Sequence, residues 1–158
     1  MVPECVLQQM LTKAHEAKEN AYSPYSKVRV GSAVLTECGQ ILAGANVECA
    51  CYGLGVCAER GLLTHAASQG FRRFKAIVVV SNLPEITPCG ACRQFIAEFG
   101  TDIEVYLDCP IDGADRKPRQ AGILDLLPGA FLPNNLLETP SNGLTPASQQ
   151  GADSQTSS

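Results

Sequence analysis

Hydrophobic positions recur with two different periods along this chain, which predicts a mixture of helices and strands. Near the start they are three and four positions apart, which predicts a helix over about residues 4–20. The apolar segments 28–35 and 41–45 are separated by the polar turn Glu37–Gln40 and predict a β-hairpin. Lys75–Ser81 is nearly continuous in valine and isoleucine, as is typical of strands covered on both faces.

The remaining pattern alternates between helix and strand. It predicts helices over about 57–69 and 89–99 and a strand over about 103–108, whereas polar Pro110–Gly122 is expected to be a loop. Two short helices are expected near the end, over Ile123–Leu127 and Asn134–Leu137. This order predicts an α/β fold in which a mixed sheet carries helices on both faces.

Length and composition favour one folded domain. A chain of 158 residues has room for a single core. From Thr139 onward the sequence consists largely of Ser, Thr, Gln, Pro and Gly and contains no Lys or Arg, so it cannot bury enough surface to order itself. We therefore expect a domain over residues 1–138 and a disordered polar tail over 139–158.

Charge and cysteine content exclude several classes of function. A net charge of −4 and an aromatic content of 6% oppose a nucleic-acid partner. The longest aliphatic run, Ala76–Val80, is too short to span a membrane, and the first residues lack the pattern of a signal peptide. Eight cysteines without such a signal predict metal ligation and a reducing compartment: the cytoplasm, with the nucleus as a possible additional location.

Three cysteines and one glutamate carry the most informative pattern. Cys89 and Cys92 open a predicted helix, where positions three apart share a face. Cys57 opens another helix, and Glu59 follows two residues later. Zinc bound by three protein ligands keeps a fourth position for water, and a neighbouring carboxylate can move the protons of that water. We therefore expect one catalytic Zn²⁺ per chain, held by Cys57, Cys89 and Cys92, with Glu59 as the proton shuttle.

Three thiolates give such a site a net negative charge, which opposes ionisation of the water. A nearby cation would offset this charge, and Arg60 and Arg93 each stand next to a ligand. One alternative is a structural zinc site, closed by a fourth thiolate from Cys49 or Cys51. A redox Cys-x-x-Cys is the other alternative, but it would leave the first cysteine and the glutamate unexplained.

On these residues the chain resembles the small homotetrameric cytidine deaminases of pyrimidine salvage. The likeness covers about residues 20–137. It rests on the segments Ala21–Ser26, Val30–Ala33, Gly44–Glu48, Ala50–Tyr52, Cys57–Arg60, Thr87–Gln94, Glu98–Gly100 and Leu126–Pro128. The resemblance implies a three-layer α/β/α cytidine-deaminase-like fold with a mixed central sheet of about five strands. It also implies hydrolysis of cytidine and 2′-deoxycytidine to uridine and 2′-deoxyuridine with release of ammonia.

The resemblance further implies roles for single residues. Asn46 and Glu48 would hydrogen-bond the ribose 3′-hydroxyl, the N–H of Ala58 would contact the base carbonyl, and the carbonyl of Thr87 would lie near the departing amino group. Phe131 resembles the aromatic that reaches into a neighbouring subunit's site, which implies a homotetramer with shared active sites.

One departure from the family concerns the pocket wall. Val28-Arg29 stands where the family often has Phe-Pro, so we expect Val28 to form a smaller wall in a looser base pocket.

Three other functions stay open. A deaminase of another cytosine nucleoside, such as blasticidin S, would share the metal motif. A polynucleotide or transfer-RNA deaminase is disfavoured by the acidic charge, the scarce aromatics and the cysteine at the common histidine ligand position. A zinc-binding scaffold without turnover would have no use for Glu59.

Overall fold

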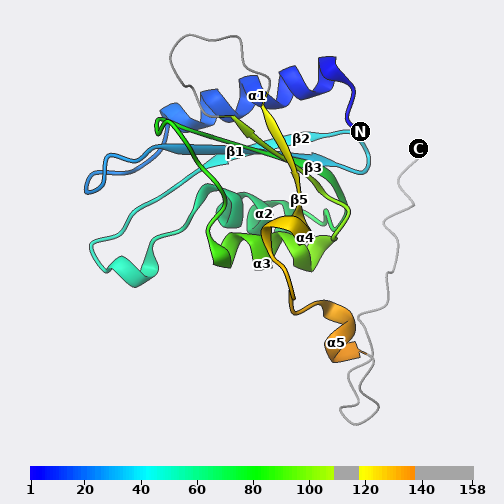
Figure 1. Ribbon diagram of the computed structural model, residues 1–158. Helices are drawn as coiled ribbons and strands as arrows, with labels where there is room; N and C mark the ends of the chain where they lie inside the picture. Colours follow the sequence, from blue (N-terminus) through cyan, green and yellow to red (C-terminus); the bar gives the residue numbers. More distant parts are fainter. Residues whose placement is uncertain (109–117, 138–158) are drawn as a thin grey trace, which may run out of the picture.

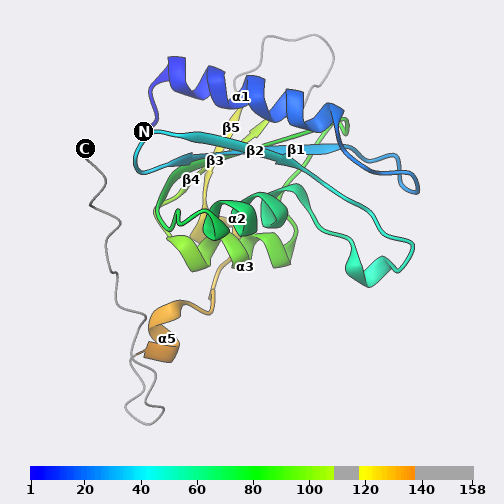
Figure 2. The same ribbon diagram turned by 180° about the vertical axis from the view of Figure 1, so that it is seen from behind.

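The computed structural model describes residues 1–108 and 118–137, which form a five-stranded sheet with helices on both faces (Figure 1, Figure 2). The strands are β1 (Val30–Thr36), β2 (Ile41–Ala45), β3 (Phe74–Ser81), β4 (Glu104–Asp108) and β5 (Arg119–Gly122). The helices are α1 (Glu4–Glu19), α2 (Ala58–Ser68), α3 (Gly90–Phe99), α4 (Ile123–Leu126) and α5 (Pro133–Leu137), and a 3₁₀ turn spans Tyr52–Leu54. The predicted tail over 139–158 lies outside the described residues.

The sheet is mixed, as predicted. Its strand order is β2-β1-β3-β4-β5. Only the central pair β3 and β4 is parallel, and α3 connects these two strands. Strand β5 lies in the segment expected to be a loop, so that part of the prediction is wrong. Its side chains Arg119 and Gln120 are exposed, and a polar edge strand carries no hydrophobic period to reveal it.

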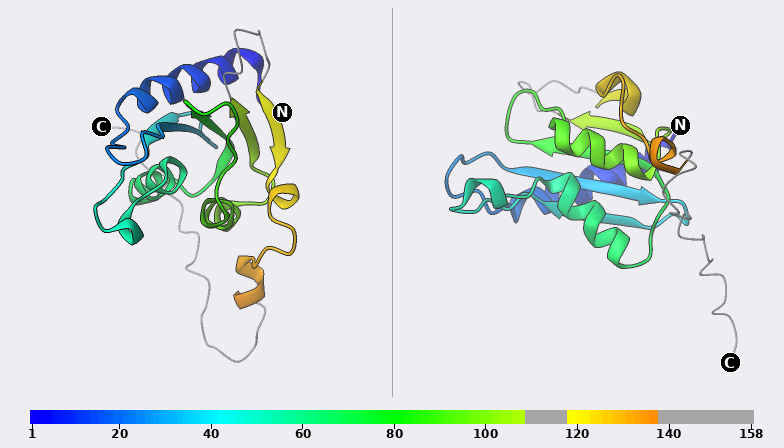
Figure 3. Two further views of the ribbon diagram at one scale, coloured as in Figure 1. Left: turned by 60° about the vertical axis from the view of Figure 1, so that its left-hand side comes forward. Right: turned by 90° about the horizontal axis from the view of Figure 1, so that it is seen from below.

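The helices form two layers around the sheet. Helix α1 covers one face, and α2 and α3 lie side by side on the other (Figure 3). The central strand β3 is buried on both sides because Val78 packs with Met10 of α1, whereas Ile77 and Val79 pack with Leu62 of α2. This double burial explains the continuous apolar sequence of β3. No helix among residues 1–108 and 118–137 has the length and apolarity needed to cross a membrane.

Helix α1 lies directly against β1 at Gly31. A Cβ atom at this position would lie 2.0 Å from the carbonyl oxygen of Ala14 and 2.8 Å from the backbone nitrogen of Lys18. To make room for this atom, the backbone of α1 or of β1 must shift, and either shift loses core contacts. Gly31→Ala should therefore lower the free energy of unfolding by about 1–3 kcal/mol. Urea unfolding measures this loss.

Gly53→Ala is the matched control, because no atom lies within 4 Å of a Cβ built there. It should leave the urea midpoint nearly unchanged. A Gly31→Ala variant as stable as the parent would show that α1 does not sit against β1 as described.

Candidate active site

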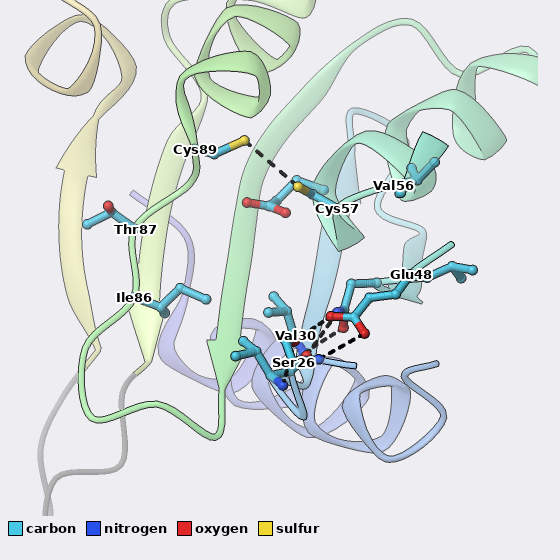
Figure 4. Close-up of a pocket in the computed structure, with 13 residues that line it drawn as sticks. Ser26, Val30, Glu48, Val56, Cys57, Ile86, Thr87 and Cys89 are labelled. Carbon is cyan, nitrogen blue, oxygen red and sulfur yellow. Dashed lines mark hydrogen bonds between the residues drawn. The ribbon is translucent and has the colours of Figure 1, made fainter. Parts of the chain in front are cut away.

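Two helix N-termini bring three thiols together. Cys57 caps α2, Cys89 caps α3, and Cys92 lies in the first turn of α3. The sulfur atoms of Cys57 and Cys89 are 3.8 Å apart, those of Cys89 and Cys92 are 3.4 Å apart, and all three lie within 4.8 Å of one another. Figure 4 shows Cys57 and Cys89 facing each other from their two helices. Zn–S bonds of about 2.3 Å in tetrahedral geometry place sulfurs about 3.8 Å apart, so this cysteine trio fits a zinc ion.

The trio has no fourth protein ligand within the described part of the chain. No other Cys, His, Asp or Glu of residues 1–108 and 118–137 belongs to this group, and Cys49 and Cys51 lie outside it. The alternative of a closed four-thiolate site therefore finds no support there. The cysteine trio leaves one position of a tetrahedral ion to water or substrate, which is the arrangement of catalytic sites.

Two of the three thiols differ in acidity. Hydrogen bonding from Cys92 lowers the pKa of Cys57 to about 5, Cys89 and Arg60 act in the same direction, and burial opposes them. The same hydrogen bond, together with burial, raises the pKa of Cys92. The lowered pKa favours the thiolate form of Cys57, whereas the raised pKa of Cys92 favours its thiol, so a metal that binds both sulfurs displaces a proton.

Arg60 lies against this thiolate. The guanidinium has its pKa raised chiefly by the hydrogen bond to Cys57, and its Nη2 also donates to the Gly55 carbonyl at 3.5 Å. Its buried Nε has no hydrogen-bond partner among the described atoms. A cation held this way reduces the negative charge of the cysteine trio.

Arg93 has different contacts. Its Nε donates to the Pro88 carbonyl at 2.7 Å, its Nη1 to the Leu126 carbonyl at 2.7 Å, and its Nη2 to Thr87 Oγ1 at 3.1 Å. These bonds tie the loop before α3 to the end of α4. The prediction that Arg93 tunes the metal site stays a prediction, and the contacts themselves indicate that it fixes the loop that carries Cys89.

Glu59 is a buried carboxyl group beside the cysteine trio. Only 3% of its surface is exposed, and it lies in the first turn of α2. Burial raises its pKa above the ordinary range, and the negative charge of Cys57 adds to the rise. A carboxyl group with a raised pKa can both accept and donate a proton near neutral pH, as a proton shuttle requires.

A cavity of about 360 Å³ opens from this point. Cys57, Cys89 and Glu59 lie along it, which places the metal ligands and the carboxyl group in one chamber. Its apolar walls come from Val28, Val30, Val47, Val56 and Ile86. The volume suits a small organic molecule held between apolar walls.

The part of the cavity away from the cysteine trio is polar and carries Glu48 and Ser26 (Figure 4). Asn46 also lines the cavity and is hydrogen-bonded to the neighbouring Val30. The Glu48 carboxylate accepts the Tyr25 N–H at 2.9 Å, the Ser26 N–H at 3.2 Å and the Ser26 hydroxyl. The Ser26 hydroxyl contributes most to lowering the pKa of Glu48 below its usual range. The sequence singled out Asn46 and Glu48 but missed Ser26, since a serine in a loop carries no distinguishing local signal.

Ser26 therefore influences the pH at which Glu48 ionises. A lowered pKa keeps Glu48 ionised into mildly acidic solution, and Ser26→Ala removes the largest cause of that lowering. The pKa of Glu48 should then rise toward the ordinary value of a carboxyl group. NMR titration of the Glu48 side-chain carboxyl group measures this shift directly. Ser26→Thr keeps the hydroxyl and should retain the parent titration curve; superposable titration curves for the alanine variant and the parent would refute the coupling.

The other predicted residues are placed as follows. Ala58 is buried at the first position of α2, where a backbone N–H has no acceptor within the helix. Thr87 lines the cavity, and Val28 belongs to its wall. Phe131 does not line it: its side chain is 57% exposed, and its carbonyl accepts a hydrogen bond from Gln94 Nε2 at 2.6 Å. The chain's own cavity is thus formed without Phe131.

Comparisons with known proteins agree with this geometry. Residues 5–108 match the family model described as the cytidine and deoxycytidylate deaminase zinc-binding region. A Dictyostelium discoideum protein named as a probable cytidine deaminase is 46% identical over 83% of this chain and 87% of its own length. A cytidine deaminase of Halalkalibacterium halodurans is 43% identical over 78% of this chain and 92% of its own length.

Solved structures show the same fold. The crystal structure of a cytidine deaminase from Burkholderia pseudomallei superposes with a TM-score of 0.72 at 43% identity, covering 78% of this chain and 98% of that one. The cytidine deaminase of Mycobacterium tuberculosis gives a TM-score of 0.64 at 34% identity, over 79% and 96% of the two chains. These matches confirm the α/β fold with its mixed sheet. The chain belongs to the zinc-binding cytidine and deoxycytidylate deaminase family.

Proposed function

We propose that this protein hydrolyses cytidine and 2′-deoxycytidine to uridine and 2′-deoxyuridine with release of ammonia. The observation that carries the proposal is a single cavity that brings the cysteine trio and the buried Glu59 together with Asn46 and Glu48. The first set of groups suits activation of water, and the second suits hydroxyl groups of a sugar. The names of the similar proteins support the same substrate.

The chemistry assigns several tasks to Glu59. Bound zinc supplies the Lewis acidity that lowers the pKa of the attacking water. Glu59 accepts the proton of that water and transfers a proton to ring N3 of the base, which makes C4 electrophilic. After water has added to C4, Glu59 helps protonate the amino group, which leaves as ammonia. Its buried position strengthens each of these polar interactions.

Other residues orient the substrate. Asn46 and Glu48 hydrogen-bond the ribose 3′-hydroxyl, the N–H of Ala58 meets the base carbonyl, and the carbonyl of Thr87 lies near the leaving amino group. The base lies between the aliphatic walls of the cavity, where Val28 gives more room than an aromatic ring would.

An ammonia-release assay tests the proposal. The zinc-loaded protein should release ammonia from cytidine and 2′-deoxycytidine, and it should be much slower on blasticidin S and on cytosine-containing oligonucleotides. Faster release from blasticidin S would assign the site to another cytosine nucleoside. Activity on oligonucleotides would move the protein to the polynucleotide deaminases, and no release from any substrate would favour a scaffold.

We further propose a homotetramer whose active sites are shared between chains. Several large hydrophobic side chains are exposed, among them Tyr25, Tyr52 and Leu54. Tyr25 and Tyr52 line a second hollow, which shares Ser26, Glu48 and Gly55 with the cavity. Tyr52 is 85% exposed, which is unusual for a ring of this size unless another chain covers it. Phe131, exposed and outside its own cavity, suits insertion into a neighbour's site.

A complementation experiment tests the shared site. Phe131→Ala should reduce kcat/KM for cytidine by about tenfold or more, since an aromatic contact with the substrate is lost. Because that loss falls on a neighbour's cavity, mixed assemblies of Phe131→Ala and Glu59→Gln chains should contain some complete sites and exceed the sum of the two separate activities. Strictly additive activities, or a monomer by sedimentation with full turnover, would refute sharing.

The cysteine content supports a reducing compartment. We therefore place the reaction in the cytoplasm, as a step that returns cytosine nucleosides to the uridine pool in pyrimidine salvage.

A further inference from the structure

Two asparagines make the same three hydrogen bonds to the segment 27–30, whose Val28 and Val30 line the cavity. The N–H of Asn46 donates to the Val30 carbonyl at 3.1 Å, its Oδ1 accepts the Val30 N–H at 2.8 Å, and its Nδ2 donates to the Val28 carbonyl at 2.9 Å. The N–H of Asn82 donates to the Arg29 carbonyl at 3.2 Å, its Oδ1 accepts the Arg29 N–H at 2.9 Å, and its Nδ2 donates to the Lys27 carbonyl at 2.9 Å. The segment 27–30 is thus held from both sides.

The position of the two asparagines explains this pattern. Strands β2 and β3 flank β1, and they end at Ala45 and Ser81, directly before Asn46 and Asn82. Each side-chain amide therefore supplies the donor and acceptor that the next strand residue would have offered. The two amides thus continue the hydrogen-bond pattern of the sheet beyond the ends of the β1–β2 and β1–β3 pairings. They hold the segment before β1 in an extended conformation.

This pairing fixes which side chains face the cavity. Side chains alternate along an extended segment, so Val28 and Val30 point to one face and Arg29 to the other. Val28 and Val30 line the cavity, whereas the Arg29 guanidinium pairs with Glu19 of α1 at 2.6 Å. A slip of one residue would exchange the two faces and replace the apolar wall with a charge.

Asn82 also holds the turn that leads to the polar end of the cavity. Lys27 has φ = 61°, the left-handed region that a side chain other than glycine adopts at a cost in free energy. The Nδ2 of Asn82 binds the carbonyl of this residue, and the preceding Ser26 makes its hydrogen bonds to Glu48. A backbone conformation of this kind persists only where surrounding contacts, such as this hydrogen bond from Asn82, stabilise it.

We propose that Asn82 is a positioning residue for the nucleoside pocket. Asn82 does not line the cavity, so it acts through residues that do. It holds Val28 in the wall, and it holds the segment that Asn46 binds from the opposite side. It also fixes the turn at Ser26, which binds Glu48. The proposal rests on the proposed function, because the groups it positions are Asn46 and Glu48, which are assigned to the sugar, and Val28, which is assigned to the wall beside the base. According to this proposal, Asn82 affects how tightly the substrate binds. The chemical step depends on residues of α2 and α3.

Kinetics of Asn82→Ala and Asn82→Asp on two substrates test this role. Asn82→Ala should raise KM for cytidine about tenfold and change kcat by less than about threefold, since it loses two hydrogen bonds remote from the reacting atoms. The rise should be smaller for 2′,3′-dideoxycytidine, which keeps the base beside Val28 but lacks the hydroxyl groups that Asn46 and Glu48 bind. Asn82→Asp keeps the acceptor for Arg29 but loses the donor to Lys27, so its KM should be intermediate.

Amide hydrogen exchange gives a readout independent of turnover. The Arg29 amide should exchange faster in Asn82→Ala than in the parent, whereas zinc content should stay at one per chain. Asn20→Ala is the control. Within residues 1–108 and 118–137, the one side-chain hydrogen bond of this exposed asparagine goes to the Glu16 carbonyl, at 3.4 Å near the end of α1. The control variant should match the parent in both measurements.

The outcomes separate this inference from the proposed function. A parent protein that releases no ammonia from cytidine overturns the proposed function and this inference with it. An active parent with an unchanged KM in Asn82→Ala overturns the inference alone. An equal rise in KM for both substrates, or a fall in kcat as large as the rise in KM, also overturns it, because either result indicates a general loss of structure.

Discussion

Replacing Glu59 with glutamine is expected to lower kcat for cytidine by about three to four orders of magnitude while zinc stays bound. Glutamine has nearly the same size and remains a hydrogen-bonding group, so the packing around this 3% exposed position should survive. It cannot accept the proton of the attacking water or return one to the base. Steady-state ammonia release and zinc analysis on the same preparation measure the two parts of this expectation.

Glu98→Gln is the matched control, since Glu98 is exposed on α3 and outside the cavity. It should retain the parent rate. Turnover of the Glu59→Gln protein within tenfold of the parent would contradict the proton-shuttle role, and loss of its zinc would show that the carboxyl group serves the metal site directly.

Replacing Cys92 with alanine is expected to abolish both zinc binding and turnover. Cys92 is fully buried in the first turn of α3, and its sulfur lies 3.4 Å from that of Cys89. With one of three protein ligands removed, the remaining pair binds zinc weakly, and zinc should fall from about one to well below 0.2 per chain after dialysis. Zinc analysis by atomic emission and a thermal unfolding scan measure the effect.

Cys51→Ala controls for cysteine loss in general. Cys51 is exposed and lies outside the cysteine trio, so its alanine variant should keep zinc and activity. Full zinc occupancy in Cys92→Ala would remove this residue from the ligand set. Zinc loss in Cys51→Ala would instead support a fourth thiolate and a closed structural site.

Elements with a strong hydrophobic period were predictable from the sequence, and elements without one were not. The predicted helix over about 4–20 corresponds to α1 (Glu4–Glu19), and the strand predicted over Lys75–Ser81 corresponds to β3 (Phe74–Ser81). Helix α1 buries one face, which gives its sequence a helical period of hydrophobic residues. Strand β3 is covered by helices on both faces of the sheet, which makes its sequence continuously apolar. Strand β5 was missed because its exposed polar residues obtain their order from pairing with β4, and such pairing leaves no local trace.

The metal site was predictable for a similar reason. Its cysteines stand at helix N-termini, so the spacing of Cys89 and Cys92 already fixes their common face, and Glu59 is two residues from Cys57. The positioning residues were not predictable. Ser26 binds Glu48 across 22 positions, and Asn82 binds Arg29 across 53, so only the folded sheet brings these groups together.

Zinc K-edge X-ray absorption of the zinc-loaded protein tests the central claim most directly, because it counts the ligand atoms by element and distance. The account predicts three sulfur atoms at about 2.3 Å and one lighter atom, oxygen, at about 2.0 Å. Four sulfur atoms would contradict it, since the ion would then have no position open for the water that Glu59 is placed to deprotonate.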